Sequence, residues 1–450
     1  MPDLIYAISS FARQRGGFPP LPVINMLAET VETETTTVLQ SRPGLENTDI
    51  TMGTGDMRGL YQADGVLGNA LFGVSGDKLY EDGTLVGTID GNGPVSFCGY
   101  SDYIFVCAGE SIWSYDGTTL SSIAFPDGAD VSKILVAASR LVAIRASTGT
   151  IYWSDPLGVT IDALAFAEAE NSPDTLKDMQ YLGDRLILLG AETVEFWQPS
   201  EDPDLPFQPL IGTALSVGCK TTGASSRFNN GFAWVSNFNE VCLDDPNNII
   251  SSPDLQIKIR NSAEVALWVF YVDDAEYLLL KLSNETWVYG ARTQVWSEFK
   301  SYGHTNWLPS CYDAGYFGSS LSGVPLMQWS EGHEDLGGVL ERRFRAWTPI
   351  TNGSLKLGSI ALRTNPGFTP FLIGDYSDPV VELRTSRDGG SSWQLWKQRS
   401  LGIQGEYRRK VVWGSLGQFS YPGALVEIRV TDPVDFRASG LVYNEPLGGR

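Results

Sequence analysis

The sequence predicts an all-β protein: a β-propeller of about six blades with an N-terminal extended arm and a C-terminal β-sandwich-like domain. Only 19% of the 450 residues are charged, and the 48 glycines and 13 tryptophans favour short strands joined by tight turns. Pairs of short apolar strands also recur along the chain at a spacing typical of propeller blades. The charge balance changes sign near residue 350, which indicates a second domain.

Residues 1–50 show little regular pattern. Three prolines (Pro19, Pro20 and Pro22) are followed by a threonine-rich stretch, 30–38, that alternates as an edge strand would. We interpret this segment as an extended arm with one or two strands, which packs as a strap against the rest of the protein.

Residues 51–350 contain the repeats. In each unit a short apolar strand is followed by a polar or glycine turn and a second strand that carries an aromatic residue. The first strands of six units begin at residues 70, 103, 140, 185, 232 and 277, so the steps are 33, 37, 45, 47 and 45 residues. A four-stranded blade takes roughly 40–50 residues. The repeat matches no WD or kelch consensus, and an irregular stack of hairpins or a β-sandwich is the alternative. The segments near residue 50 or at 310–330 are candidates to complete a blade.

Helix signals are sparse in this region. Residues 162–170 alternate alanine with acidic and apolar residues, and Pro173 would stop a helix there. We expect two helical turns at this place, in a loop between blades.

Residues 351–450 differ in charge from the first 350. They hold 12 basic and 9 acidic residues, a net charge of +3, whereas the first 350 hold 20 and 44, a net charge of −24. Alternating stretches such as 380–384, 410–413 and 425–430 predict a small antiparallel β-sandwich.

The composition bears on location and partners. With 32 basic and 53 acidic residues the net charge is −21, which argues against a protein that grips duplex DNA through its phosphates. The first 22 residues hold no apolar run of signal-peptide length, and no stretch approaches the roughly 20 apolar residues that span a bilayer. We therefore expect a soluble protein made in a cytoplasm.

The five cysteines follow no metal-binding or disulfide spacing, so we expect buried small hydrophobic residues in a reducing compartment. They are Cys98, Cys107, Cys219, Cys242 and Cys311. The chain has two histidines, His304 and His333, and neither belongs to an HxxxH or HExxH motif. The sequence therefore predicts no catalytic residue, no metal site and no cofactor site.

Three carboxylate clusters are the remaining candidates for chemistry: 201–204, Asp244–Asp245 and Asp273–Asp274. Paired carboxylates serve glycoside hydrolysis or bind calcium. Each cluster, however, lies beside proline, asparagine or a turn, where acidic side chains bind backbone N–H groups. We favour the loop interpretation, and for the glycine-rich stretch 53–59 we likewise favour a turn.

The sharpest local motif is Ser386-Arg-Asp388-Gly-Gly390-Ser-Ser-Trp393, which fits the "Asp-box" pattern of sialidases and other propellers. The aspartate is expected to accept backbone N–H bonds in a tight hairpin turn, the glycine to supply a positive φ, and the tryptophan to pack beneath. A sialidase would need several copies, an arginine cluster and an activated tyrosine. With one copy outside the repeats, the box is predicted to stabilise the fold.

Two stretches together resemble a known family. The first is Leu21-Pro-Val-Ile-Asn-Met-Leu-Ala-Glu29, followed by Ser41-Arg-Pro-Gly-Leu45. The second contains the Asp box, then 400–409, Trp413, Leu416-Gly417 and Val430-Thr-Asp-Pro-Val434. Both resemble the packaged-DNA stabilisation proteins, or tail nozzles, of short-tailed phages. The sequence departs from the family pattern at Ile24, which is an extra residue, and at Gly414-Ser415.

The resemblance implies a structural virion protein that is not an enzyme. Such a protein forms a ring, hexameric in that family, that extends the DNA channel below the portal and adaptor. It retains packaged DNA and lets it exit at infection. The implied partners are other copies of the chain, the tail adaptor and a spike, fibre or needle protein, with DNA passing unbound. The implied location is the virion tail, assembled in the host cytoplasm. The alternative is a glycan-binding or sialidase-like propeller in receptor recognition. The tryptophans and the Asp box favour this alternative.

Overall fold

The computed structural model describes residues 3–4, 9–10, 19–30, 37–91, 93–169, 174–202, 204–367 and 376–444. The chain forms two compact units. The propeller unit consists of Asn47–Ser283 and Leu308–Gln328, and the sandwich unit of Met1–Glu46, Asn284–Trp307 and Trp329–Arg450. Because each unit joins separated stretches, this division does not test the consecutive segments 1–50, 51–350 and 351–450, which remain a prediction.

The propeller unit contains seven antiparallel groups of strands in chain order: five are four-stranded sheets, and two belong to larger sheets. They are β6 (Met57–Tyr61), β7 (Phe72–Ser75), β8 (Lys78–Glu81) and β9 (Thr84–Thr88); β10 (Val95–Tyr100), β11 (Tyr103–Ala108), β12 (Ser111–Tyr115) and β13 (Leu120–Ile123); β14 (Val131–Ala137), β15 (Arg140–Arg145), β16 (Thr150–Ser154) and β17 (Ile161–Glu168); β18 (Leu176–Leu182), β19 (Arg185–Gly190), β20 (Val194–Pro199) and β21 (Phe207–Pro209); β22 (Ser225–Phe228), β23 (Gly231–Val235), β24 (Val241–Leu243) and β25 (Asp245–Ile249); β26 (Val265–Val272) and β27 (Ala275–Leu282); and β30 (Pro309–Asp313), β31 (Tyr316–Ser319) and β32 (Met327–Ser330).

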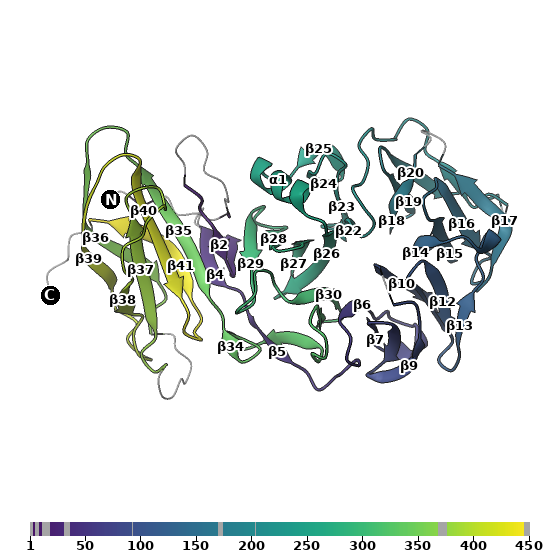
Figure 1. Cartoon of the computed structure of the whole chain (residues 1–450), viewed down its shortest axis with the longest axis horizontal. Helices are drawn as coiled ribbons and strands as arrows, with labels where there is room; N and C mark the ends of the chain where they lie inside the picture. The colour runs from purple at the N-terminus through teal and green to yellow at the C-terminus, as the bar shows by residue number, and fades with distance from the viewer. Residues whose placement is uncertain are drawn as a thin grey trace. The chain divides into compact units, whose positions relative to one another are not determined.

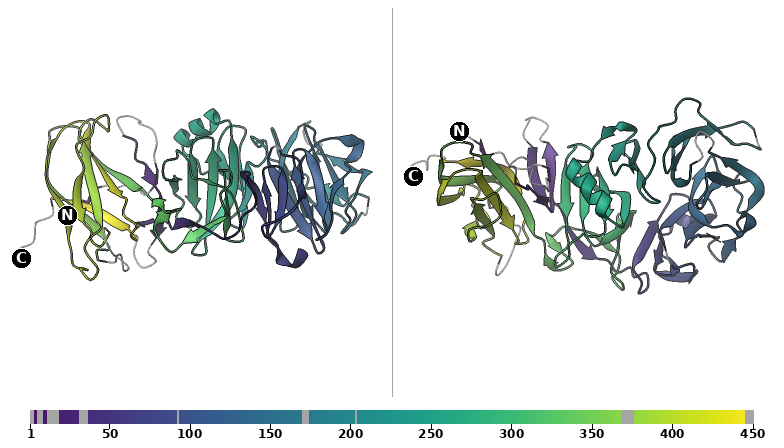
Figure 2. Two further views of the ribbon diagram at one scale, coloured as in Figure 1. Left: turned by 60° about the horizontal axis from the view of Figure 1, so that its bottom comes forward. Right: turned by 45° about the horizontal axis from the view of Figure 1, so that its top comes forward.

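The first strands of these sheets form a closed ring. Each of β6, β10, β14, β18, β22, β26 and β30 contacts the next, and β30 contacts β6 (Figure 1). Figure 2 shows the blue and teal sheets of this unit from two further directions. The predicted all-β propeller is thus confirmed, with seven sheets around the axis where the repeats indicated about six. The seventh comes from 309–330, the segment proposed to complete a blade.

Two-residue turns explain why the strands pair as hairpins. Asn229–Asn230 and Asp273–Asp274 have positive φ at both residues, which fits the right-handed twist of the flanking strands. Apolar clusters then join neighbouring blades: Phe72, Val74 and Leu79 of the first blade share one cluster with Ile104 and Val106 of the second. Each blade buries its apolar face only against its neighbours, so closure of the ring completes the core.

The expectation of a helix at 162–170 is wrong over its described residues, 162–169; residue 170 lies outside the described part of the chain. Residues 161–168 form β17, which pairs with β16, and most of its side chains lie exposed. Tertiary pairing therefore overrides the alanine-rich local preference. The structure has its α-helix at α1 (Pro253–Asn261), where Ser252 caps the first turn through a bond from the Leu255 amide and Pro253 occupies the first helical position. Two short 3₁₀ turns, η1 (Leu67–Asn69) and η2 (Pro126–Gly128), complete the helical elements of the described residues.

The sandwich unit consists of two main sheets with a shared apolar core. One sheet follows the order β28 (Thr286–Gly290), β29 (Trp296–Phe299), β2 (Val23–Ile24), β35 (Arg342–Pro349), β40 (Gly423–Val430), β37 (Val380–Ser386) and β38 (Lys397–Ser400). The other follows β3 (Met26–Thr30), β4 (Thr37–Ser41), β41 (Arg437–Tyr443), β36 (Leu355–Thr364) and β39 (Val411–Phe419), and β1 (Asp3–Leu4) pairs with β41. A small third group joins β5 (Gly44–Asn47), β33 (Glu334–Asp335) and β34 (Gly338–Val339).

The N-terminal arm contributes strands to both main sheets of the sandwich unit. Ile24 pairs with Glu298 on one side and Arg343 on the other, and β3 pairs with β4. The described strands of this segment therefore pack within the sandwich unit. Of the threonine-rich stretch 30–38, residues 31–36 lie outside the described part of the chain.

Candidate functional site in the axial cavity and the sandwich unit

The seven inner strands enclose a cavity of about 700 Å³ on the propeller axis. All seven inner strands supply lining residues, because the side chains of each alternate between the axis and the neighbouring blade. The polar and aromatic members are Tyr61, Lys133, Gln180, Tyr181, Arg227, Trp268, Tyr271, Glu276, Tyr312 and Asp313. A cavity on the axis of a closed ring of blades is a candidate binding site.

The charges of the cavity are largely engaged within the protein. Lys133 forms an ion pair with Asp178, whose side chain is fully buried. The other carboxylate oxygen of Asp178 accepts a bond from the Gly223 amide at 3.1 Å. Asp313 accepts bonds from the Gln62 and Ala314 amides at 3.1 and 2.8 Å. The cavity therefore presents fixed polar groups.

Burial shifts two of these groups toward their neutral forms. It raises the pKa of Tyr61 to about 12, with further contributions from Cys98 and Asp313. It also raises the pKa of the Asp313 carboxyl, against the two backbone bonds that favour the charged form. The Tyr61 hydroxyl therefore stays protonated at neutral pH and can donate or accept a hydrogen bond.

Burial determines the protonation of several cysteines and of one histidine. All five cysteines are free, four of them buried and Cys311 half-buried. Burial raises the pKa of the Cys107, Cys242 and Cys311 thiols to about 12, so they remain protonated at neutral pH. His304 is exposed, whereas burial and the neighbouring Arg342 lower the pKa of His333 to about 4. Within the described residues no group of three metal-ligating side chains comes together, and no helix is long and apolar enough to cross a membrane.

The three carboxylate clusters lie in turns or at the start of a strand, where their side chains bind backbone amides or shape the turn. Asp202 accepts a bond from the Asp204 amide at 2.9 Å, Asp244 from the Phe232 amide at 2.8 Å, and Asp245 from the Asn247 amide at 2.7 Å. Asp273 and Asp274 form the turn between β26 and β27. In the glycine-rich stretch, Gly53 has a φ of +72° and the Gly55 amide donates to Ser75 Oγ at 3.1 Å, which is also a turn.

The Asp box forms the turn geometry expected of it. Asp388 Oδ1 accepts bonds from Ser386 Oγ at 2.7 Å and from the Ser392 amide at 2.8 Å. The Gly390 amide donates to Ser386 Oγ at 2.9 Å, and the φ of Gly390 is +99°. Bonds from the Ser392 hydroxyl and amide hold the pKa of the Asp388 carboxyl well below its usual range. Together these bonds stabilise the hairpin between β37 and β38.

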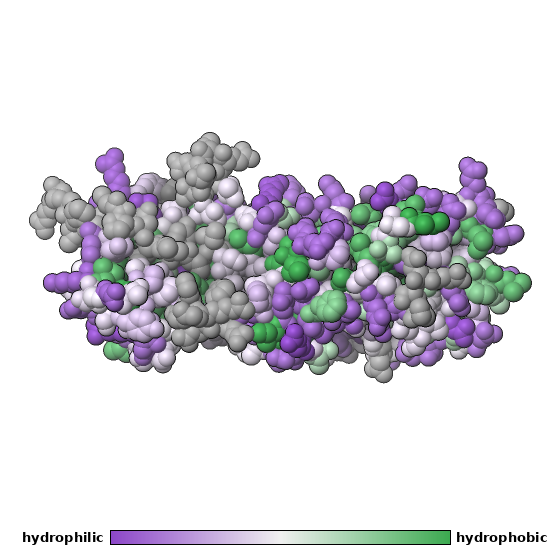
Figure 3. Space-filling view, turned by 90° about the horizontal axis from the view of Figure 1, so that it is seen from above, coloured by the Kyte–Doolittle hydropathy of each residue, from purple (hydrophilic) through white to green (hydrophobic). Residues whose placement is uncertain are grey.

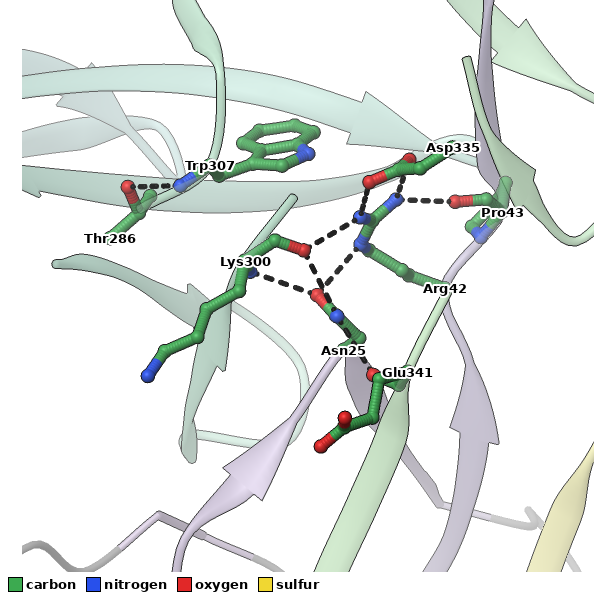
Figure 4. A network of polar contacts seen from close by, with 8 residues as sticks. All are labelled: Asn25, Arg42, Pro43, Thr286, Lys300, Trp307, Asp335 and Glu341. Atoms are coloured by element: carbon green, nitrogen blue, oxygen red, sulfur yellow. Dashed lines mark hydrogen bonds and ion pairs between the residues drawn. The ribbon is translucent and has the colours of Figure 1, made fainter. Parts of the chain in front are cut away.

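The N-terminal motifs meet in one buried network of the sandwich unit (Figure 4). Arg42 is fully buried and forms two bonds with Asp335, at 3.0 and 2.6 Å. Its Nε donates to Asn25 Oδ1 at 3.0 Å, and Asn25 Nδ2 donates to the carbonyls of Lys300 and Glu341 at 3.0 and 2.8 Å. The two motif residues thus fasten the arm to the two other stretches of the unit.

Aromatic rings and a glycine complete this network. The Arg42 guanidinium lies 5.3 Å from the ring centroid of Phe299 and 5.6 Å from that of Trp307. Asn25 has a φ of +54°, a conformation that asparagine adopts more readily than most residues. A Cβ at Gly44 would lie 2.1 Å from the Glu334 carbonyl oxygen, so only glycine fits there. The spacing of these motifs had no pattern from which their contact could be predicted.

The C-terminal motif holds a second buried arginine. The Arg342 guanidinium donates to the carbonyls of Asp432 and Val434 and, at 3.1 Å, to Ser41 Oγ. The Asp432 carboxylate accepts a bond from the Val380 amide at 2.7 Å. The Asp-Pro-Val segment of the family pattern therefore positions backbone acceptors around Arg342.

Sequence analysis did not find a ladder of arginine and tryptophan side chains on the sheet that contains β35, β37, β38 and β40. Arg384 lies between the rings of Trp393 and Trp396, 4.5 and 4.4 Å from their centroids. Arg345 lies 4.8 Å from the ring centroid of Trp393, and Arg429 lies 4.2 Å from that of Trp396. Glu427 pairs with Arg345 and Arg384, and Glu382 with Arg429, so buried carboxylates balance the ladder. Period-two spacing of Arg and Glu in 380–386 and 423–430 was the signal that could have indicated it.

Comparison with known proteins identifies one family. The family model described as "Bacteriophage P22 Gp10, beta-propeller" matches residues 12–308, which is more than half of the chain. A comparison with curated protein sequences gave no match.

Solved structures resemble the chain only distantly. The N-terminal part of BBS1 in complex with ARL6 is 15% identical, with a TM-score of 0.43, and the match covers 66% of this chain and 99% of that chain. YCF48 from Cyanidioschyzon merolae is 11% identical, with a TM-score of 0.39 and coverage of 64% and 98%. The AfRom2 CNH domain is 11% identical, with a TM-score of 0.37 and coverage of 68% and 96%. Similarity at this level says nothing about what the chain does.

Proposed function

As a member of the phage-stabilisation family that the P22 Gp10 β-propeller model describes, the chain is a structural protein of a phage tail, and we propose that it works by forming a ring around the path of the DNA. In this proposal the ring is a hexamer, and it extends the channel below the portal and adaptor. It retains the packaged DNA and lets it exit at infection. The family membership carries this proposal.

The axis of the propeller is lined by side chains from all seven inner strands, among them Tyr61, Trp268 and Tyr271. In this proposal the conduit is therefore the hole between the subunits of a ring. Closed rings of identical subunits are a common solution in symmetric assemblies. In this proposal the propeller acts as a rigid wall element and performs no catalysis.

The charge of the propeller unit fits a wall that DNA does not grip. The unit holds 33 acidic and 12 basic residues, a net charge of −21. Carboxylates repel phosphates, so a lumen lined by this unit would let a duplex pass. We expect a predominantly acidic lumen; a ring with a basic channel lining would contradict this part of the proposal.

The proposed partners follow from the same role. They are neighbouring copies of the chain, the tail adaptor above, and a spike, fibre or needle protein alongside or below. The protein would assemble in the host cytoplasm and remain in the virion tail. The burial of the tryptophans weakens the glycan-binding alternative. All thirteen are buried or half-buried. Trp393 of the Asp box is in contact with two arginines.

Electron-microscope class averaging of the purified protein, alone and mixed with the tail adaptor of its parent particle, tests the proposal. A ring with an axial hole of at least about 20 Å, the width of a duplex, is the expected result. Subunits that remain single in both samples would contradict the ring. Binding on a glycan array by such single subunits would favour the receptor-binding alternative.

A further inference from the structure

A groove on the propeller unit combines apolar and acidic side chains. It lies between the outer strands of the third and fourth blades and has a volume of about 860 Å³. Its lining residues are Phe166, Ala167, Glu168, Glu195, Trp197, Ser200, Asp202, Leu205, Phe207, Gln208 and Pro209. Three of these are acidic and none is basic. Glu201 and Asp204 of the carboxylate cluster lie exposed beside Asp202, which adds to the negative charge at the rim.

The apolar part of this acidic groove is open to solvent. Phe166 is 41% exposed and Leu205 is 50% exposed, and Leu164 on the same strand as Phe166 is 86% exposed. On the face drawn in Figure 3, hydrophilic side chains cover much of the surface, with apolar spots among them. Exposed apolar side chains rimmed by polar residues are typical of an interaction site.

A loop of the sandwich unit has the complementary composition. In the basic loop, residues 402–410, Arg408, Arg409 and Lys410 are exposed beside Ile403 and Tyr407, whose exposed fractions are 49% and 57%. In this loop the one carboxylate is Glu406, which pairs with Arg409 at 2.6 Å. The loop therefore carries surplus positive charge next to apolar surface.

The basic loop is preorganised by its own turns. The Glu406 amide donates to the Ile403 carbonyl at 3.0 Å, and the Arg409 amide to the Glu406 carbonyl at 3.1 Å. Gly402 has a φ of +99°, which lets the chain turn away from β38. A preorganised loop loses little conformational entropy on binding.

We infer that the basic loop of one copy docks into the acidic groove of a second copy, as a head-to-tail contact of the proposed ring. This inference rests on the proposed function, because a contact between two different surfaces closes into a ring when the rotation between neighbours allows it. Ile403 and Tyr407 cover Phe166 and Leu205, while the cations of the loop lie against the carboxylates of the rim.

Two features favour a second copy over DNA as the occupant of the basic loop. Phosphates would need only the cations, whereas the loop also exposes Ile403 and Tyr407, which match the apolar part of the groove. The propeller unit of a neighbouring copy is itself a strong anion, with a net charge of −21. Complementary charge steers such surfaces together and excludes wrong registers.

Sedimentation velocity of the full chain over a wide concentration range tests the contact. We expect the wild type to associate, more weakly at high salt. R408E/R409E and E168K/D202K should each weaken association at least about tenfold, because like charges then face each other. An equimolar mixture of the two variants should restore association, since each interface then pairs opposite charges again. The controls K356E/R363E and D64K/D102K change equal charge at exposed sites elsewhere and should associate as the wild type does.

Each other outcome overturns the inference in a distinct way. Wild-type association that neither variant changes would assign the ring to another contact and leave the proposed function standing. A wild type that stays monomeric would remove the contact, while microscopy on the adaptor would still test the ring separately. Loss of binding to a labelled duplex by R408E/R409E, measured by fluorescence anisotropy with sedimentation unchanged, would assign the loop to DNA. Thermal melting of every variant shows whether it is folded.

Discussion

The two units of the molecule are stabilised in different ways. The propeller unit has 33 acidic and 12 basic residues and is built mainly from consecutive repeats, whereas the sandwich unit has 20 of each and combines three separated stretches. Both fully buried arginines of the described chain, Arg42 and Arg342, lie in the sandwich unit. Repeated apolar strands find their neighbours by sequence order alone. Stretches that meet from far apart need directional bonds, which the buried arginines supply.

Replacing Arg42 with alanine should lower the free energy of unfolding more than the other substitutions below. Asp335 would remain buried without its partner, and removal of one member of a buried pair costs about 3–5 kcal/mol of unfolding free energy. We expect the loss in the sandwich unit, with the propeller unit largely unaffected. Denaturant unfolding with hydrogen exchange resolved by peptide measures both units in one sample.

Two controls sharpen this test. R42K keeps the charge but cannot form the two parallel bonds to Asp335, so it should recover only part of the loss. R437A removes an arginine whose side chain is 51% exposed and should change the unfolding free energy by less than about 0.5 kcal/mol. Equal loss in the two units on R42A would contradict the comparison.

Replacing Leu188 with alanine tests the propeller side. Leu188 is fully buried in β19, within the cluster shared by the third and fourth blades. The cavity left behind should cost about 3 kcal/mol. Because blades contact only their neighbours, exchange should rise first in these two blades. L85A, at a side chain 52% exposed in the first blade, is the matched control and should leave exchange unchanged. Uniform loss over all seven blades would show that the ring opens as one unit.

The same difference explains what the sequence predicts well. The first strands of the repeat units, recognised from their apolar runs, are the second strands of the blades, such as β11 and β15. Inner strands were harder to recognise because they carry polar side chains toward the axis, as Lys133 and Gln180 do. The seventh blade was not counted because its second strand, Tyr316–Ser319, ends in glycine and serine and so lacks an apolar run. Apolar periodicity therefore reveals the repeats, but it does not show which strand of each blade is the innermost.

Long-range polar contacts could not be predicted from the sequence. Arg42 and Asp335 are 293 residues apart, and no periodicity links them. The resemblance of the N-terminal motif to a family indicates that Asn25 and Arg42 matter, but only the structure shows the bonds that join them. The groove between two blades is likewise set by how the outer strands β17 and β20 lie in space, although its acidic cluster at 201–204 is visible in the sequence.

Acid should weaken the sandwich unit through His333. Burial and Arg342 hold its pKa at about 4, with opposing contributions from Asp435 and the Arg42 carbonyl and a further lowering by Arg437. Its unfolded pKa is about 6.5, so between pH 6.5 and 4 the unfolded chain binds more protons and stability falls as pH falls. At pH 5 the loss is about 2 kcal/mol. In H333Q the unfolding free energy should therefore depend less on pH in this window, measured by denaturant unfolding at pH 7 and pH 5. H304Q, at an exposed histidine, is the control; a pH profile of H333Q that matches the wild type would contradict the assignment.

The smallest effect is expected from D388A in the Asp box. The side chain lies at the surface, but it accepts bonds from the Ser386 hydroxyl and the Ser392 amide that fix the hairpin between β37 and β38. Their loss should lower the melting temperature by a few degrees and raise hydrogen exchange in 386–393 only. D388N keeps an acceptor at the same position, so its melting temperature should lie between those of the wild type and D388A. A structural turn predicts that assembly follows stability, so loss of ring formation at an unchanged melting temperature would give the hairpin a role in contacts between copies.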